Sequence, residues 1–314
     1  MNSTVALRAT ATQRVPRRHV DGVLLLDKPR GLSSNAALQR VKRWYRAEKA
    51  GHTGTLDPLA TGLLPVCFGE ATKFAHLLLD ADKRYLATLR LGVTTTTGDA
   101  EGEVVATRPV TASREAVEEI LPRFVGRIAQ VPPRYSALKR DGRTYYEYAR
   151  KGVDLPRIAR EVVIRSIGLL SWRAPEVELA VHCGKGTYMR ALAEDIGEAL
   201  GCGAHLAALS RTAVGEFTLA WALTLDALEE RSEPERDAAL LPVDTLVVRL
   251  DRLDLARAEA TCLVQGRPLI RGDVGDGLVR VYAAGAFAGV ADVRGGVVRA
   301  RRMMAQLQRR ATPA

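Results

Sequence analysis

The alternation of hydrophobic and polar positions is clearest between residues 85 and 93. The odd-numbered positions from Tyr85 to Leu91 are aromatic or apolar, and Thr88 and Arg90 lie between them. A period of two predicts a half-buried β-strand. Apolar runs predict further strands at residues 22–27, 162–170, 176–183, 279–282, 289–293 and 297–301. Amphipathic or capped segments predict helices at residues 36–45, 70–79, 113–124, 191–200 and 223–230.

One stretch without such periodicity, residues 51–62, reads Gly-His-Thr-Gly-Thr-Leu-Asp-Pro-Leu-Ala-Thr-Gly. It holds a single carboxylate, Asp57, and a single imidazole, His52. Pro58 removes a backbone donor and disfavours helical dihedral angles at Asp57. We therefore interpret residues 51–62 as a shaped loop that holds one acid, with neither helix nor strand. An ordinary Asp-Pro turn is the alternative, and the glycine- and threonine-rich composition favours a site.

The predicted helix at 191–200 follows the sequence Gly184-Lys-Gly-Thr187. This run lacks the Gly-x-x-x-x-Gly-Lys-Ser/Thr spacing of a nucleotide-binding loop, which argues against an NTPase. We expect Thr187 to cap the helix, so that Arg190 lies in the first turn. The helix dipole disfavours a cation there, and we propose Asp57 as the acidic partner of Arg190. Pairing with Glu194, one turn further on, is the alternative.

The C-terminal part changes character. Residues 229–237 form a charged break, and residues 240–246 end the first domain. From residue 250 onward, glycines separate short strand-like segments, which predicts a small β-rich second domain.

The chain of 314 residues carries a formal net charge of +10 and has a pI near 9.7. Such a charge favours a polyanionic partner. An acidic membrane surface could also attract it, but no apolar run reaches the roughly 18 residues that cross a bilayer, and the N-terminus lacks an apolar signal core. The basic residues 1–19 are interpreted as a mobile tail, with contact to a phosphate backbone as the alternative.

The four cysteines form no Cys-x-x-Cys pair, and no histidine cluster has metal-ligand spacing. We therefore expect no metal site, no disulfide framework and a reducing, cytoplasmic setting.

Basic residues and tyrosines interleave between Gln130 and Arg150. Such a segment suits contact with a nucleic-acid strand, with arginines on phosphates and tyrosines on sugars or bases. The alternative is a tyrosine-rich helix that packs on the core.

Three motifs carry a family resemblance. Leu-Asp-Lys28-Pro29-x-Gly-Leu-Ser-Ser, the stretch at 51–62, and Gly-Lys-Gly-Thr-Tyr188-Met-Arg190-Ala-Leu-Ala-Glu-Asp-Ile-Gly resemble the TruB family of tRNA pseudouridine synthases. That family modifies the uridine at position 55 in the T-loop of tRNA. The resemblance runs from about residue 23 to residue 302.

The resemblance implies a role for each matching residue. Asp57 is the expected catalytic residue, Tyr85 stacks on the target uracil and Arg190 pairs with Asp57. The residues His52, Tyr188 and Leu209 contact the substrate nucleoside. The supporting residues are Lys28, Pro29 and Asp99, the last of these in the polar turn at 94–99.

The resemblance also implies an α+β fold. Its catalytic domain, residues 20–248, has a mixed, mainly antiparallel sheet flanked by helices and contains an RNA-gripping insertion at 132–152. A PUA-like RNA-binding domain follows at 249–308, between the tail at 1–19 and a short tail at 309–314. The implied protein is a cytoplasmic, monomeric isomerase that needs no cofactor or metal and acts on the T-arm stem-loop of tRNA.

The expected chemistry suits a single acid. Pseudouridine formation breaks the N1–C1′ bond, turns the uracil over and joins C5 to C1′, whereas a glycoside hydrolase normally needs two carboxylates. Asp57 could attack carbon or remove a proton. Three other functions stay open: a non-catalytic tRNA-binding or tRNA-folding protein, an N-glycosylase that releases uracil, and a pseudouridine synthase acting on another RNA.

Overall fold

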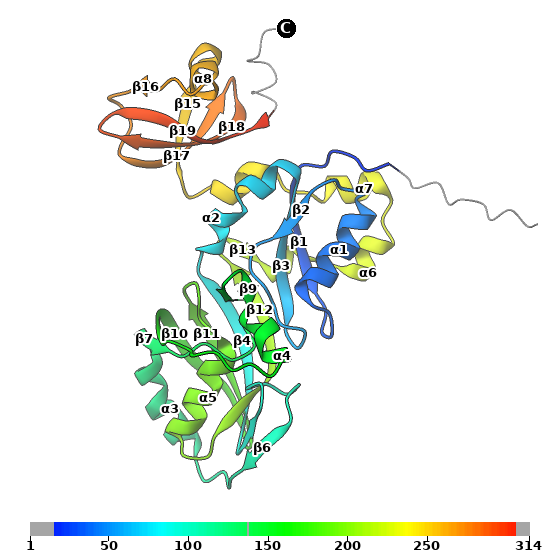
Figure 1. Cartoon of the computed structure of the whole chain (residues 1–314), viewed down its shortest axis with the longest axis vertical. Helices are drawn as coiled ribbons and strands as arrows, with labels where there is room; N and C mark the ends of the chain where they lie inside the picture. Colours follow the sequence, from blue (N-terminus) through cyan, green and yellow to red (C-terminus); the bar gives the residue numbers. More distant parts are fainter. Residues whose placement is uncertain (1–15, 137, 306–314) are drawn as a thin grey trace, which may run out of the picture.

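The structure is a computed structural model that describes residues 16–136 and 138–305. The expectations for most of the basic tail at 1–19 and for the tail at 309–314 lie outside the described residues. Figure 1 shows an elongated molecule with a large sheet and, at one end, a smaller C-terminal sheet. The fold is α+β, as predicted.

The main sheet has ten strands in the order β14-β1-β3-β12-β4-β11-β10-β7, with β13 beside β12 and β2 beside β3. The strand bounds are β1 Gly22–Lys28, β2 Ala50–His52, β3 Thr61–Phe68, β4 Lys83–Leu91, β7 Gly126–Gln130, β10 Arg160–Arg173, β11 Glu176–Cys183, β12 Ala204–Val214, β13 Phe217–Thr218 and β14 Leu223–Thr224. Of the described pairings, β1 with β14 and β3 with β12 are parallel, and the others in this sheet are antiparallel. The expectation of a mainly antiparallel sheet is confirmed.

Several helices cover one face of the main sheet, among them α1 (Ser34–Trp44) and α5 (Met189–Ala199). Helix α1 begins after Ser33, whose hydroxyl accepts a hydrogen bond from the backbone of Ala36. Helix α5 packs with α1 and the strands into one large hydrophobic cluster. On the opposite face, residues of β1, β3 and β12 form a second hydrophobic cluster. They pack there against η1 (Gly69–Lys73), α2 (Ala75–Leu79) and η4 (Val243–Val247).

Several predicted helices are shorter than expected. The predicted helix at 70–79 is divided into η1 and α2, and the one at 113–124 into α3 (Arg114–Ile120) and η2 (Leu121–Phe124). Ser113 caps α3 as predicted, and Pro122 ends the α-helical hydrogen bonding because it has no N–H. Strand β14 occupies the start of the predicted helix at 223–230, which leaves α6 (Leu225–Glu229).

The charged break expected at 229–237 is wrong. It contains helix α7 (Glu233–Ala238), which begins with a capping box between Ser232 and Glu235. A short exposed helix needs no apolar stripe, so the hydrophobic pattern did not reveal it.

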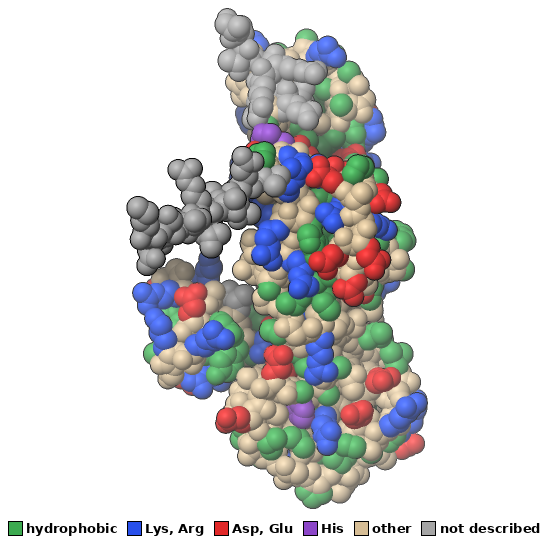
Figure 2. Space-filling view, turned by 90° about the vertical axis from the view of Figure 1, so that its right-hand side faces the viewer, with side chains coloured by type: hydrophobic (Ala, Val, Ile, Leu, Met, Phe, Trp, Pro, Cys, Tyr) green, Lys and Arg blue, Asp and Glu red, His purple; other side chains and the backbone are tan. Residues whose placement is uncertain are grey.

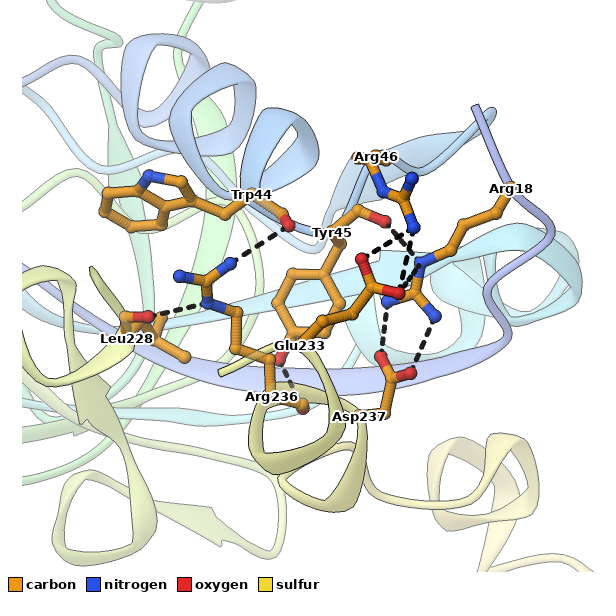
Figure 3. A network of polar contacts seen from close by, with 8 residues as sticks. All are labelled: Arg18, Trp44, Tyr45, Arg46, Leu228, Glu233, Arg236 and Asp237. Carbon is orange, nitrogen blue, oxygen red and sulfur yellow. Dashed lines mark hydrogen bonds and ion pairs between the residues drawn. The ribbon is translucent and has the colours of Figure 1, made fainter. Parts of the chain in front are cut away.

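Helix α7 fastens the start of the described chain to α1 (Figure 3). Arg18 donates hydrogen bonds to both carboxylate oxygens of Asp237, at 2.6 and 2.5 Å. The hydroxyl of Tyr45 donates to the carbonyl of Arg236 at 2.7 Å, and the Arg236 guanidinium donates to the carbonyl of Trp44 at 3.2 Å. These bonds join three separate segments of the chain around the fully buried side chain of Tyr45, and the ion pair of Arg18 with Asp237 stays partly exposed.

The insertion contains a small hairpin, β8 (Lys139–Arg140) and β9 (Arg143–Thr144), followed by helix α4 (Tyr145–Arg150). A second small hairpin, β5 (Val93–Thr95) and β6 (Val104–Thr107), extends from the end of β4.

The C-terminal sheet has five strands in the order β15-β17-β18-β19-β16. Their bounds are β15 Asp251–Leu255, β16 Leu269–Ile270, β17 Gly277–Ala283, β18 Ala286–Arg294 and β19 Val297–Met303, and helix α8 (Arg257–Val264) packs on them. Phe287 meets Phe74 next to α2 edge-on at 5.3 Å, and the Tyr282 hydroxyl donates to Asp244 in η4 at 2.6 Å. An apolar contact and a hydrogen bond therefore join the C-terminal sheet to the main body.

Among residues 16–136 and 138–305, no helix is long and apolar enough to cross a membrane.

Candidate active site

Asp57 lies in the irregular segment between β2 and β3. The expectation that the whole stretch 51–62 lacks strands is wrong at both ends, because Gly51 and His52 belong to β2 and Thr61 and Gly62 begin β3. Backbone pairing of β2 with β3 creates these ends and requires no side-chain periodicity.

Ser34, at the start of α1, holds this segment through the backbone of Leu56. Its hydroxyl accepts from the Leu56 N–H at 2.7 Å and donates to the Leu56 carbonyl at 2.9 Å. The N–H of Gly31 donates to the carbonyl of Pro58 at 2.8 Å. The residues on both sides of Asp57 are therefore fixed by the segment that carries Lys28 and Pro29.

Arg190, on α5, connects the Asp57 loop with the turn at 97–99 and with Tyr135. Its Nη2 atom lies 3.0 Å from Oδ2 of Asp57, and its Nε atom lies 3.7 Å from Oδ2 of Asp99. The same guanidinium donates to the carbonyls of Thr97 at 3.2 Å and Tyr135 at 2.7 Å. The Arg190 side chain is only 6% exposed, whereas that of Asp57 is 40% exposed. Arg190 is thus a buried support, and Asp57 is open to a ligand.

The predicted pairing of Arg190 with Asp57 is confirmed. In the described part of the chain, Arg190 forms ion pairs with Asp57 and Asp99, and none is recorded with Glu194. The predicted cap at Thr187 is wrong, because its hydroxyl donates to the carbonyl of Gly184 and Tyr188 is the residue before the helix.

The electrostatic environment of Asp57 is balanced between burial and cations. Burial raises the pKa of the Asp57 carboxyl, and the charge of Asp99 raises it further, whereas Arg190 and Lys28 lower it. Burial lowers the pKa of Lys28 to about 8, while the charge of Asp57 opposes this shift. The Lys28 ammonium donates to the carbonyls of Pro29 at 2.9 Å and Leu32 at 2.6 Å, so it is held beside the loop.

Tyr85 and Leu209 occupy neighbouring strands of the main sheet. Tyr85 on β4 pairs with Arg211 on β12, and Leu209 lies two positions along β12. Because alternate residues share a face, Tyr85 and Leu209 point to the same side of the sheet. Burial raises the pKa of the Tyr85 hydroxyl, and the charge of Asp57 adds to this shift. The phenol therefore stays neutral and within the electrostatic reach of Asp57.

Tyr188 and His52 complete the predicted set. Burial raises the pKa of Tyr188, with a small contribution from the charge of Asp57. Burial and the charge of Arg211 lower the pKa of His52, which favours the neutral imidazole. The structure records no bond between His52 and Asp57, and Nδ1 of His52 is buried without a hydrogen-bond partner.

The sequence pattern did not reveal Arg211. Its side chain is buried, its Nε donates to the carbonyl of Leu63 at 2.8 Å, and its guanidinium donates to the carbonyl of Gly54 at 3.1 Å. The nearby charge of Arg211 lowers the pKa of the Tyr85 hydroxyl against the larger effect of burial. A charged residue inside an otherwise buried strand was the available signal.

A hollow of about 370 Å³ lies on the sheet beside this region, with Thr61, Leu86, Leu209 and Ser210 among its lining residues. Neither Asp57 nor Tyr85 lines it. We therefore define the candidate site by the exposed carboxylate of Asp57 and the residues around it, and not by this hollow.

The insertion is largely exposed. Arg140, Arg143 and Arg150 lie at the surface, and Tyr146 is 42% exposed beneath the Arg150 guanidinium. The space-filling view shows a lobe with Lys and Arg side chains at the height of α4 (Figure 2). Of the α4 residues only Ala149 is buried, so this helix does not pack its tyrosines fully into the core.

Within residues 16–136 and 138–305, no group of three or more His, Cys, Asp or Glu side chains could hold a metal ion. The four cysteines are free thiols.

Comparison with known proteins assigns the class. The model of the TruB family pseudouridylate synthase N-terminal domain matches residues 42–189, and that of the tRNA pseudouridylate synthase B C-terminal domain matches residues 190–248. These matches place the chain among the pseudouridylate synthases. More particularly, the chain belongs to the TruB family.

Two relatives illustrate the similarity. The chain is 54% identical over 293 residues to tRNA pseudouridine synthase B of Azoarcus sp. (strain BH72), covering 93% of this chain and 98% of the relative. It is 57% identical over 299 residues to tRNA pseudouridine synthase B of Burkholderia mallei (strain ATCC 23344), covering 93% and 96%.

A solved structure has the same overall fold. A chain in the crystal structure of a Cbf5-Nop10-Gar1 complex superposes with a TM-score of 0.68 at 26% identity, covering 90% of this chain and 84% of that one.

Proposed function

We propose that this chain isomerises uridine to pseudouridine at position 55 in the T-loop of tRNA. The observation that best supports this proposal is the ion pair between Asp57 and Arg190. The partly exposed carboxylate of Asp57 lies 3.0 Å from the buried guanidinium of Arg190. Relatives that share more than half of their residues with the chain are named tRNA pseudouridine synthase B, which supports tRNA as the substrate.

In this reaction Asp57 acts at the ribose. Cleavage of the N1–C1′ bond leaves positive charge on the sugar and negative charge on the uracil. An ionised carboxylate can attack the sugar carbon or remove a sugar proton, and the charge of Arg190 favours the ionised form of Asp57 against the larger effect of burial on its pKa. Uracil then turns, C5 joins C1′, C5 gives up its hydrogen and N1 gains one. Reactant and product have the same composition, so no cofactor is required.

The neighbouring residues handle the extruded base. Tyr85 stacks on the uracil, and Leu209, on the same face of the sheet, contacts its other parts together with Tyr188. His52, neutral at neutral pH, occupies space vacated by the base. Lys28, Pro29 and Asp99 support the Asp57 loop and Arg190.

Two parts of the chain bind the rest of the RNA. The insertion at 132–152 presents exposed arginines, and residues 249–308 form a PUA-like RNA-binding domain joined to the catalytic domain, residues 20–248. We propose that the protein works as a monomer in the cytoplasm on the T-arm stem-loop.

The test compares wild type with Asp57→Asn on unmodified tRNA transcripts. Joining C5 to C1′ releases the C5 hydrogen, so tritium release from [5-³H]uridine reports turnover, and nucleoside chromatography with mass spectrometry identifies the product. We expect pseudouridine from wild type only, and no product from a transcript with cytidine at position 55. Turnover by Asp57→Asn close to the wild-type rate would remove Asp57 from the mechanism. Free uracil would indicate the N-glycosylase instead, and tight binding without product would indicate the binding protein.

A further inference from the structure

Gln130, the last residue of β7, forms two hydrogen bonds with the backbone of Tyr188. Its side-chain N–H donates to the Tyr188 carbonyl at 3.1 Å, and its side-chain oxygen accepts from the Tyr188 N–H at 2.8 Å. Gln130 is 1% exposed. A buried amide that uses one donor and one acceptor on a single residue fixes both the position and the orientation of that residue.

Tyr188 is the point at which α5 begins. It is the N-cap residue and no side chain caps the helix, while its carbonyl accepts the first helical bond from Leu192 at 3.0 Å. Free N–H groups at a helix start need partners. Gln130 supplies one for the Tyr188 N–H and binds the same carbonyl that starts the helix. The two hydrogen bonds between Gln130 and the backbone of Tyr188, called the clasp below, therefore determine where the first turn of α5 lies. Arg190 is in that turn.

The clasp also marks the base of the insertion. Gln130 lies just before residues 132–152, and the carbonyl of Tyr135 accepts from Nη2 of Arg190 at 2.7 Å. The same nitrogen lies 3.0 Å from Asp57. A shift of Tyr135 relative to α5 would therefore move Nη2 of Arg190 away from Asp57. The bonds between Gln130 and Tyr188 oppose such a shift.

We propose that Gln130 is a positioning residue, which holds Tyr188 and Arg190 in register with the insertion so that the carboxylate of Asp57 stays aligned during the reaction. This inference rests on the proposed function. It assigns Gln130 an effect on the reaction step that exceeds any effect on RNA affinity, because the clasp touches neither Asp57 nor an exposed surface.

Two near-isosteric variants test it. Gln130→Met removes both hydrogen bonds. Gln130→Glu keeps an acceptor for the Tyr188 N–H but directs an anionic oxygen at the Tyr188 carbonyl. Protonation restores a donor, and burial raises the pKa of such a carboxyl. The controls are Gln39→Met, an exposed amide on α1, and Val243→Ala, a core change in the second hydrophobic cluster.

The measurements are the single-turnover rate of tritium release, the Kd for a T-arm stem-loop and the thermal midpoint. Misplacement by about 1 Å can cost a hundredfold in rate. We expect both Gln130 variants to lose at least tenfold in rate with Kd changed less than threefold. The ratio of Gln130→Glu to wild-type rates should rise as the pH falls from 8 to 5.5, and the ratio for Gln130→Met should not. Gln39→Met should match wild type.

Three results would overturn the inference while wild type still forms pseudouridine. These are Gln130 variants with rates within threefold of wild type, a Kd that rises as much as the rate falls, and a rate loss that Val243→Ala reproduces at an equal loss of thermal midpoint. If wild type forms no pseudouridine, the proposed function fails first and the inference fails with it.

Discussion

The guanidinium of Arg190 and the carboxylate of Asp57 lie 3.0 Å apart, although α5 and the loop before β3 are distant in the sequence. Arg190 serves four acceptors at once: two carboxylates and two carbonyls. The planar fork of an arginine can satisfy such a set, and the compact ammonium of a lysine cannot.

Replacing Arg190 by Lys should therefore reduce the reaction rate although the charge is kept. We expect the single-turnover rate on a T-arm stem-loop to fall on the order of a hundredfold, with RNA affinity within threefold of wild type. A rate within threefold of wild type would show that charge alone is sufficient and that the geometry of the four bonds is not required.

The rate should depend on pH through Asp57. Burial raises the pKa of this carboxyl, so its protonated, inactive form persists to a higher pH than in an ordinary aspartate. As the pH is lowered, the reaction rate should therefore begin to fall at a higher pH than the pKa of an ordinary aspartate would give. Lys28 lowers the same pKa, so Lys28→Met should move the acid limb of the rate profile to higher pH. Single-turnover rates between pH 4.5 and 8 measure both profiles. An acid limb that moves to lower pH in the variant would contradict the assigned sign.

Gly62 cannot carry a side chain without displacing β12. Its φ is +97°, and a Cβ atom there would lie 2.4 Å from the carbonyl oxygen of Arg211 and 2.8 Å from its nitrogen. Gly62→Ala should cost at least about 2 kcal/mol of unfolding free energy, since backbone strain and a backbone clash add. Urea denaturation measures the loss. Gly51→Ala is the matched control, because nothing lies within 4 Å of its Cβ position, and it should be nearly neutral.

The Tyr45 hydroxyl should contribute measurably to stability. Tyr45→Phe removes the bond to the Arg236 carbonyl but keeps the ring, which packs on Phe68 with centroids 4.7 Å apart. We expect a loss of about 1 kcal/mol, because one hydrogen bond is removed while the Arg236 carbonyl still accepts from the Ala239 N–H at 3.1 Å. Tyr148→Phe is the control, since that hydroxyl makes an exposed contact at 3.5 Å. Equal denaturation midpoints for the two variants would refute the stabilising role assigned to the hydrogen bond between Tyr45 and Arg236.

Binding to tRNA should weaken with salt. Cations on phosphates release counterions, so log Kd should rise linearly with log salt concentration, by at least about tenfold in Kd between 50 and 200 mM. Arg140 and Arg143 are exposed on the insertion, and the double change to alanine should reduce the slope by about one for each lost phosphate contact. An unchanged slope would place the insertion arginines away from the backbone.

Part of this site could be predicted from the sequence because its signals are local. The period of two at Tyr85 marks β4, and a cation in a helical first turn required an acid, which led to the pairing of Arg190 with Asp57. Gln130 carried no comparable signal, and the charge of Arg211 inside a strand did not indicate which groups it binds. Both act on backbone atoms of segments that are distant in the chain, and a backbone partner leaves no trace in the residue types.

The contact between Phe287 and Phe74 connects the C-terminal sheet to the strand that carries Tyr85. Phe74 directly precedes α2, and α2 leads within a few residues into β4, which carries Tyr85. Only a short stretch of chain therefore separates the contact with the C-terminal sheet from Tyr85. If the C-terminal sheet and the catalytic domain bind the same RNA, as proposed, the packing of Phe287 on Phe74 helps to set the separation of the two binding surfaces.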